Sequence, residues 1–149
     1  MVMWHFADFP FRQAVEIRLR FRLASSADNG KRYTIIANCL SLCEDGRGPG
    51  VYLGIQTGVT DEIIGMVDTT DNNKLQELRL PYKGGWVDLL LRYDGIKVRL
   101  EVDGESVEAP RIGDISKRQT ALLLGRFAIP GDSNLIGDVD DLQVFTCLP

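Results

Sequence analysis

Hydrophobic and charged residues alternate with a period of two along much of the chain. The alternation is unbroken in residues 15–23 and returns in residues 96–103, and this period is typical of strands with one buried face. Residues 87–91 are apolar on both faces at their centre, which predicts a strand covered on each side. No stretch shows a convincing helical period, although residues 112–116 have room for one short turn. Further strands are expected at 33–41, 50–57, 62–69, 75–80, 106–109, 120–125 and 138–146.

Turn-forming residues separate these segments. Asp94-Gly95 and Asp103-Gly104 each close a strand-like run and predict tight hairpins. Many short strands with turns at intervals of about 8–12 residues are typical of antiparallel sandwiches and barrels. We therefore predict an all-β fold. Because the chain shows neither a linker nor a shift in composition, residues 1–149 are expected to form a single domain.

The composition is that of a folded protein without an excess of positive charge. Of the 149 residues, 44% are hydrophobic and 26% are charged, and 17 Lys and Arg against 21 Asp and Glu give a net charge of -4. This balance argues against a nucleic-acid partner, because binding to the phosphate backbone needs a concentrated basic surface. No run approaches the roughly 18 apolar residues of a membrane span. The first residues also lack the basic and apolar regions of a signal peptide.

The number and spacing of the cysteines predict neither a particular disulfide nor a metal site. There are three, Cys39, Cys43 and Cys147, and an odd number permits either one disulfide with a free thiol or three reduced thiols. Cys39 and Cys43 do not have CxxC spacing, and the single histidine, His5, is far from them in the sequence. The pairing of the cysteines stays open.

Five landmarks follow one another in the second half of the chain. They are Trp86, Tyr93-Asp94-Gly95, Val102-Asp103-Gly104, the apolar run that precedes Gly125, and Gly137-Asp138-Val139-Asp140-Asp141-Leu142. In this order they resemble the concanavalin A-like lectin/glucanase superfamily, specifically its laminin-G-like jelly-roll domains. The resemblance extends over residues 13–146, and its specific part lies in the second half.

The resemblance implies a jelly roll, an antiparallel two-sheet β-sandwich with six or seven strands in each sheet. It also implies that Trp86 is a buried core residue. Such domains usually occur as modules of larger extracellular or cell-surface proteins, where they bind glycans or protein partners and frequently carry a structural calcium. A secreted or cell-surface location, as part of a larger protein, is therefore expected. The implied partner is a carbohydrate or a neighbouring domain of the parent protein.

The sequence does not predict an enzyme. Glucanases of the superfamily use two carboxylates in a Glu-x-Asp-x-x-Glu strand. The nearest match here begins at Glu101, but Ser106 occupies the acid/base position, and Asp103-Gly104 is explained by its hairpin turn. We therefore predict no catalytic residue, and a small glucan-active hydrolase is the less favoured alternative.

Asp140 is the candidate metal ligand. If Leu142 and Val144 face the core, the period of two places Asp140 on the same face. An inward carboxylate must be paired or metal-bound, and in related jelly rolls the corresponding Asp helps to hold calcium, which prefers oxygen ligands. A structural calcium at Asp140 is one alternative, and pairing with an Arg or capping of backbone N–H groups is the other. A local bulge would change the assignment of faces.

Two polar regions are candidates for contact with a ligand. Asp71, Asn72 and Asn73 lie in a polar run, and Tyr82 lies between Pro81 and Lys83 in a turn signal. Exposed loops carry many binding sites, so these residues are predicted to contact a ligand. A polar loop without a ligand is the alternative.

The arginines of residues 15–23 are the third candidate. Arg18, Arg20 and Arg22 share one face of the predicted strand, and Lys97 and Arg99 share one face of the predicted strand at 96–102. If the two strands lie in one sheet, these side chains form a basic platform that would suit an anionic glycan. Interleaved acidic residues instead favour a solvated face crossed by ion pairs.

Taken together, the sequence predicts a non-catalytic, lectin-like carbohydrate-binding module. A structural or protein-interaction module is the alternative.

Overall fold

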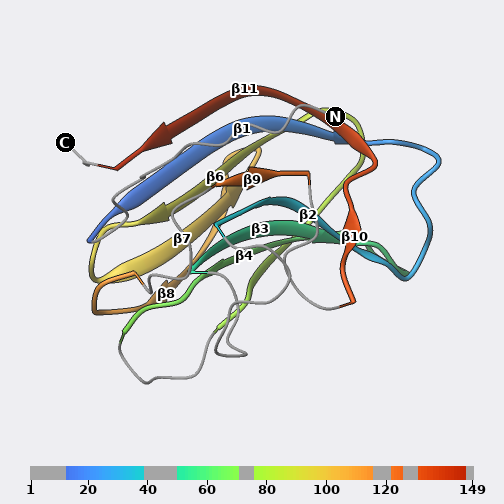
Figure 1. Cartoon of the computed structure of the whole chain (residues 1–149). Coiled ribbons are helices and arrows are strands. Elements are labelled where there is room, and N and C mark those ends of the chain that lie inside the picture. The colour runs from blue at the N-terminus through green and yellow to red at the C-terminus, as the bar shows by residue number, and fades with distance from the viewer. Residues whose placement is uncertain (1–12, 39–49, 71–75, 116–121, 126–130, 147–149) are drawn as a thin grey trace.

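Two β-sheets packed face to face make up the described part of the chain (Figure 1). The structure is a computed structural model, and it describes residues 13–38, 50–70, 76–115, 122–125 and 131–146. It contains no helix within these ranges, and hence no helix with the length and hydropathy to cross a membrane. The predicted all-β sandwich is confirmed.

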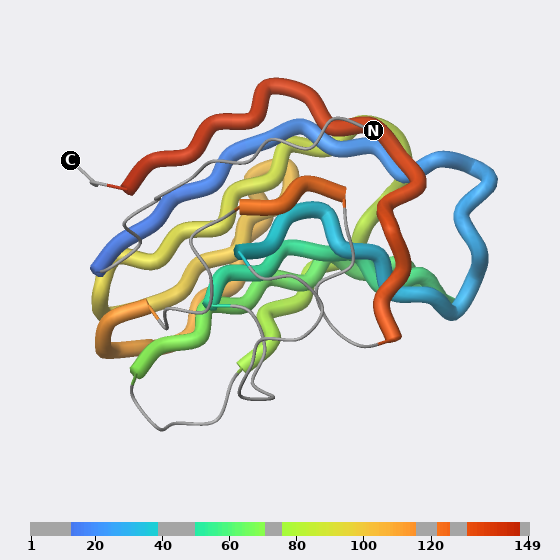
Figure 2. The backbone as a smooth tube through the Cα atoms, viewed as in Figure 1, coloured from blue at the N-terminus to red at the C-terminus, as the bar shows by residue number. Residues whose placement is uncertain are grey.

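The first sheet has five strands in the order β11-β1-β6-β7-β8. All of its pairings are antiparallel. Figure 2 shows β11, near the end of the chain, lying along β1, near its beginning. The strands are β1 (Val15–Leu23), β6 (Val87–Tyr93), β7 (Lys97–Val102), β8 (Glu105–Pro110) and β11 (Gly137–Phe145).

The second sheet has six strands, with β10-β2-β3-β4-β5 in order and β9 paired with β2. The pairing of β10 with β2 is parallel, whereas the other described pairings are antiparallel. The two-residue β10 was not predicted, because two polar residues carry no hydrophobic period. The strands are β2 (Arg32–Ala37), β3 (Val51–Gln56), β4 (Glu62–Val67), β5 (Leu78–Pro81), β9 (Leu123–Leu124) and β10 (Ser133–Asn134).

The alternation in β1 produces the core directly. Val15, Ile17, Leu19 and Phe21 are all buried, while Arg18, Arg20 and Arg22 are exposed on the opposite face. The inward side chains pack against the second sheet. The sheets approach closely at Gly65 in β4, where a Cβ atom would lie 2.9 Å from Leu91 Cδ1. Tyr33, Tyr52 and Tyr93 are also fully buried.

The hairpin at Asp103-Gly104 also follows from the sequence. Val102 pairs with Glu105, which leaves a two-residue turn between β7 and β8. Both turn residues have positive φ, 49° at Asp103 and 84° at Gly104, as the favoured two-residue hairpin turns require. Asp103 Oδ1 accepts a hydrogen bond from the N–H of Asp88 at 2.8 Å. The turn is thereby fixed to β6.

Candidate functional site

The outer face of the five-stranded sheet, which points away from the second sheet, carries an ordered lattice of polar side chains. Register places Gln143, Arg18, Leu90 and Glu101 in one row across β11, β1, β6 and β7. Two residues further along β1, Arg20 lies opposite Asp88 of β6. Since alternate residues of a strand share a face, both rows project outward.

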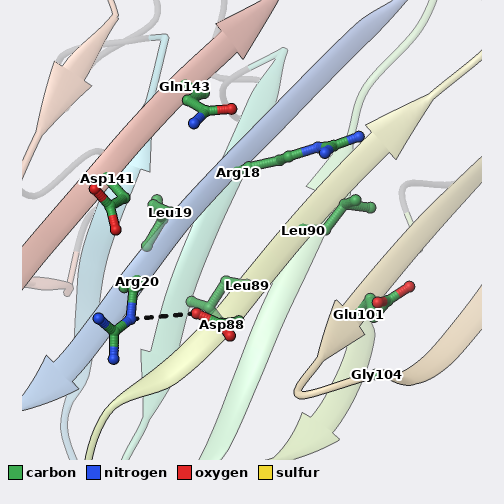
Figure 3. A pocket seen from close by; sticks show the side chains of 10 residues that line it. All are labelled: Arg18, Leu19, Arg20, Asp88, Leu89, Leu90, Glu101, Gly104, Asp141 and Gln143. Carbon is green, nitrogen blue, oxygen red and sulfur yellow. Dashed lines mark ion pairs between the residues drawn. The ribbon is translucent and has the colours of Figure 1, made fainter.

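A groove of about 520 Å³ lies over these two rows (Figure 3). Arg18 and Arg20 extend in opposite directions along β1 and leave space above the backbone of Leu19. Asp88, Glu101 and Gln143 border this space. The complete lining is Arg18, Leu19, Arg20, Asp88, Leu89, Leu90, Glu101, Gly104, Asp141 and Gln143.

Arg18 is held in place by a buried carboxylate. Glu16 is 3% exposed, and its Oε1 accepts a hydrogen bond from Arg18 Nε at 2.6 Å. Its other oxygen, Oε2, accepts from Arg92 Nη1 at 3.1 Å. The Arg18 guanidinium also lies 5.7 Å from the ring centroid of Phe145. The ion pairs predicted for this face are present, and they fix the guanidinium before any ligand arrives.

Arg20 is positioned by an acid and an aromatic ring. Its Nε lies 3.4 Å from Asp88 Oδ1, and its guanidinium lies 5.4 Å from the ring centroid of Trp86. Arg22 approaches the same ring at 4.9 Å and donates to Asp138 Oδ2. Arginines over an indole face gain cation–π attraction. The Trp86 ring therefore supports one wall of the groove.

The expected burial of Trp86 in the core is wrong. The side chain is 39% exposed. Phe21 pairs with Val87, and both are buried, so Trp86, one position earlier, projects to the opposite face. There the arginines of β1 cover its ring in place of the core.

The expectation that residues 87–91 are covered on both faces is also wrong. Leu89 and Leu91 are buried in the core, whereas Leu90 points outward and is half-buried. It lies between Arg18 and Glu101 in the first row. Leu90 thus supplies an apolar surface among the polar side chains of the groove.

A β-bulge in β11 overturns the inward placement of Asp140. Arg18 pairs with Gln143 and Arg20 with Asp140, so two steps on β1 correspond to three on β11. Asp141 takes the extra position with a φ of 51°. The bulge restores Leu142 and Val144 to the inner side but leaves Asp140 and Asp141 exposed, and Asp141 lines the groove.

The described surroundings of Asp140 supply no cluster of acidic ligands, and they do not test the predicted calcium. The carboxylate is exposed, and its Oδ1 accepts the N–H of Asp141 at 2.9 Å. No group of three or more His, Cys, Asp or Glu residues lies within metal-binding reach in the described ranges. The burial cost that motivated a metal is therefore removed, and calcium stays a prediction without support from these contacts.

Tyr82 does not reach the groove. The side chain is 8% exposed, and its hydroxyl donates to Gly85 O at 2.7 Å and accepts from the N–H of Leu23 at 3.0 Å. Its ring lies 5.7 Å from that of Phe21. Tyr82 therefore ties a turn to β1 from inside the core. Asp71, Asn72 and Asn73 lie outside the described residues, so their predicted contact with a ligand stays a prediction.

A second polar cluster lies on the other sheet and fixes β10. Asp132 Oδ2 accepts hydrogen bonds from Tyr52 Oη at 2.8 Å and Thr34 Oγ1 at 2.9 Å. Burial raises the pKa of Asp132, and the hydrogen bonds from Tyr52 and Thr34 oppose this effect. Burial, together with the charge of Asp132, also raises the pKa of Tyr52. Because these groups bond one another, the cluster has a structural role.

The carboxylates of the groove lack the setting of glycosidase acids. A general acid of that class needs a desolvated carboxylic acid. The Asp88 side chain is 77% exposed, and Glu101 Oε2 accepts a hydrogen bond from Arg99 at 2.6 Å. The groove offers instead fixed donors and acceptors around an apolar residue, an arrangement that can bind a ligand without reacting with it.

Comparisons with known proteins give relatives in molluscs. No family model matches the chain. It is 28% identical over 148 residues to the "Asparagine-rich protein" of Margaritifera margaritifera, covering 97% of this chain and 21% of that protein. It is also 28% identical over 128 residues to "Uncharacterized shell protein 26" of Lottia gigantea, covering 86% of this chain and 70% of that protein. The chain thus spans about a fifth of the Margaritifera protein.

Solved structures identify the class of fold. The structure of the mouse laminin alpha1 chain, domains LG4-5, has a TM-score of 0.64 at 15% identity. The match covers 97% of this chain and 38% of the laminin chain. The binding domain of botulinum neurotoxin DC, solved in complex with rat synaptotagmin II, has a TM-score of 0.62 at 12% identity. The match covers 90% of this chain and 32% of that chain. The structure of the same binding domain in complex with SialylT has a TM-score of 0.59 at 13% identity. The match again covers 90% of this chain and 32% of that chain.

The chain has a laminin-G-like jelly-roll fold. The predicted resemblance is confirmed at the level of the fold. The toxin domains with this architecture are binding domains by name.

Proposed function

We propose that this chain is a non-catalytic carbohydrate-binding module and that the groove on the five-stranded sheet is its binding site. The observation that carries the proposal is the alternation of donors and acceptors around an apolar residue. Arg18, Arg20 and Gln143 can donate, Asp88 and Glu101 can accept, and Leu90 lies among them. A sugar ring presents the complementary surface, with hydroxyls at its edge and C–H groups on its faces.

The charges of the groove favour a neutral ligand. Two arginines face three carboxylates, those of Asp88, Glu101 and Asp141. Arg18 and Arg20 already have acidic neighbours in Glu16 and Asp88. For a polyanion, repulsion from the carboxylates would outweigh attraction to the arginines, because its negative charges would lie near groups of both signs. The platform for anionic glycans considered from the sequence is therefore not proposed.

An extracellular location is part of the proposal. The Lottia relative is named as a shell protein, and the fold is shared with domains of a laminin chain. Because the chain spans only a fifth of the Margaritifera relative, we place it as a module within a longer secreted or cell-surface protein. A protein partner is the competing function, favoured by the structure of a similar domain bound to synaptotagmin II.

A glycan array followed by calorimetry tests the proposed function. We expect saturable binding to at least one neutral glycan, and Arg18→Ala should weaken it by about tenfold or more, because charge-assisted hydrogen bonds contribute about 1.5–3 kcal/mol. Gln143→Ala should weaken it by about three- to tenfold. Gln56→Ala, on β3 of the other sheet, is the matched control and should bind normally. The proposal would be refuted if the folded protein bound no glycan. It would also be refuted if neither Arg18→Ala nor Gln143→Ala changed the affinity.

A further inference from the structure

The groove runs across the strands of the sheet, not along them. Its lining comes from four neighbouring strands, β11, β1, β6 and β7, and ends at Gly104 in the turn after β7. Three steps between strands correspond to about 14 Å. On each of β11, β1 and β6 the lining spans only two residue steps, 141–143, 18–20 and 88–90, which is about 7 Å. The groove is therefore about twice as long as it is wide.

Among the described residues, neither end of the groove has a side chain that would close it. At one end β11 is the outermost strand of the sheet. At the other end, Glu101 pairs with Ser106 of β8, a small and exposed residue. Nearby, Gly104 has no atom within 4 Å of the position that a Cβ would take. A ligand longer than the groove can thus continue past it in both directions.

The polar groups are spread along the whole length of the groove. Gln143 and Asp141 lie at the β11 end, Arg18, Arg20 and Asp88 in the middle, and Glu101 at the β7 end. A single pyranose ring cannot reach both Gln143 and Glu101, which are three strands apart. A chain of several rings can contact all of these groups at once.

We infer that the groove binds the interior of a linear, neutral polysaccharide, with the sugar chain lying across the strands from β11 to β7. This inference rests on the proposed function and names the ligand class of the same site. It requires affinity to rise with chain length until the groove is filled. It also requires that neither end of the sugar chain be recognised.

The test is calorimetry with two neutral linear series, the cello-oligosaccharides and the chito-oligosaccharides, each from the monosaccharide to the hexasaccharide. In at least one series we expect the tetrasaccharide to bind at least about tenfold more tightly than the monosaccharide, with little further gain for the hexasaccharide. Reduction of the terminal sugar to its alditol should leave the affinity of the hexasaccharide within about twofold.

A capped groove provides the matched variant. Ser106→Trp places a large side chain at the β7 end, on an exposed strand position that accepts aromatic residues. We expect the affinity for the hexasaccharide to fall by about tenfold and that for the monosaccharide to stay unchanged. Thermal unfolding of the variant checks that it is folded.

The failures of the two proposals are distinguishable. The linear-chain inference would be overturned if affinity did not change with chain length in the series that binds. It would also be overturned if binding on the array were confined to branched, charged or single-unit glycans. In both cases carbohydrate binding itself would stand. The absence of any glycan ligand in the array and in both series would overturn the proposed function itself.

Discussion

Gly137→Ala will lower the free energy of unfolding by about 2–3 kcal/mol, a typical cost of forcing an atom into occupied space. Gly137 begins β11 and pairs with Leu23 of β1. An alanine Cβ would overlap the carbonyl oxygen of Arg22 and would lie 3.3 Å from the Cα of Leu23. Since both contacts are with backbone, a change of rotamer cannot relieve them, and β11 must move away from β1.

The same variant should also weaken ligand binding, because β11 carries Asp141 and Gln143 to the groove. Urea unfolding measures the stability. The control is Gly58→Ala, where the nearest atom to the added Cβ, Thr60 O, lies at an ordinary 3.6 Å; it should change stability by less than about 0.5 kcal/mol. A Gly137→Ala protein as stable as the wild type would show that β11 does not pack against β1 in this register.

Glu16→Ala will cost about 2 kcal/mol of stability and will loosen the groove. The buried carboxylate bonds both Arg18 and Arg92, and removal of one partner of a buried ion pair is strongly destabilising. The cost stays below the range for fully buried pairs because both guanidiniums are partly exposed. Arg18 loses its anchor, so carbohydrate affinity should fall as well.

Glu16→Gln separates charge from hydrogen bonding. The amide retains one acceptor oxygen, so we expect a loss of about 1 kcal/mol, roughly half that of the alanine variant. Glu108→Ala on the same face removes partly exposed pairs with Lys97 and Arg99, and it should cost less than about 1 kcal/mol. If Glu16→Ala proved no more harmful than Glu108→Ala in urea unfolding, the anchoring role of Glu16 would be wrong.

The sandwich was predictable because local patterns determine it. The alternation in β1 assigns its buried and exposed faces correctly, and Asp103-Gly104 supplies the two positive φ angles of its turn. Both signals lie within a few neighbouring residues. Neither needs knowledge of which strands come together.

The groove was less predictable because it depends on pairing between distant strands. Gln143 and Arg18 are neighbours only after β11 aligns with β1. One local signal was available: Leu90 is apolar at a position where the alternation calls for an outward residue, and such a residue can mark a binding surface as well as a covered strand. The loop candidates were predicted from the general tendency of loops to carry binding sites, and Asp140 from the period of two together with the resemblance.

The bulge at Asp141 explains why the face of Asp140 was assigned wrongly. A strict period of two fails wherever one strand gains an extra residue. Asp tolerates the left-handed conformation better than most residues, so the Asp140-Asp141 pair permits the bulge but does not specify it. Trp86 is a different case: its burial was expected from the resemblance, whereas alternation beside the buried Val87 places it on the outer face.

The central claim is that ligands bind on the outer face of the five-stranded sheet. Amide chemical shifts measured by NMR during titration with the tightest glycan from the array test it most directly. We predict that the largest shifts fall on the backbone of Arg20, Leu90 and Gln143, with little change at Thr34 and Gly54 on the other sheet. Shifts concentrated on the second sheet or on the loops at its ends, with the groove residues unmoved, would contradict the claim.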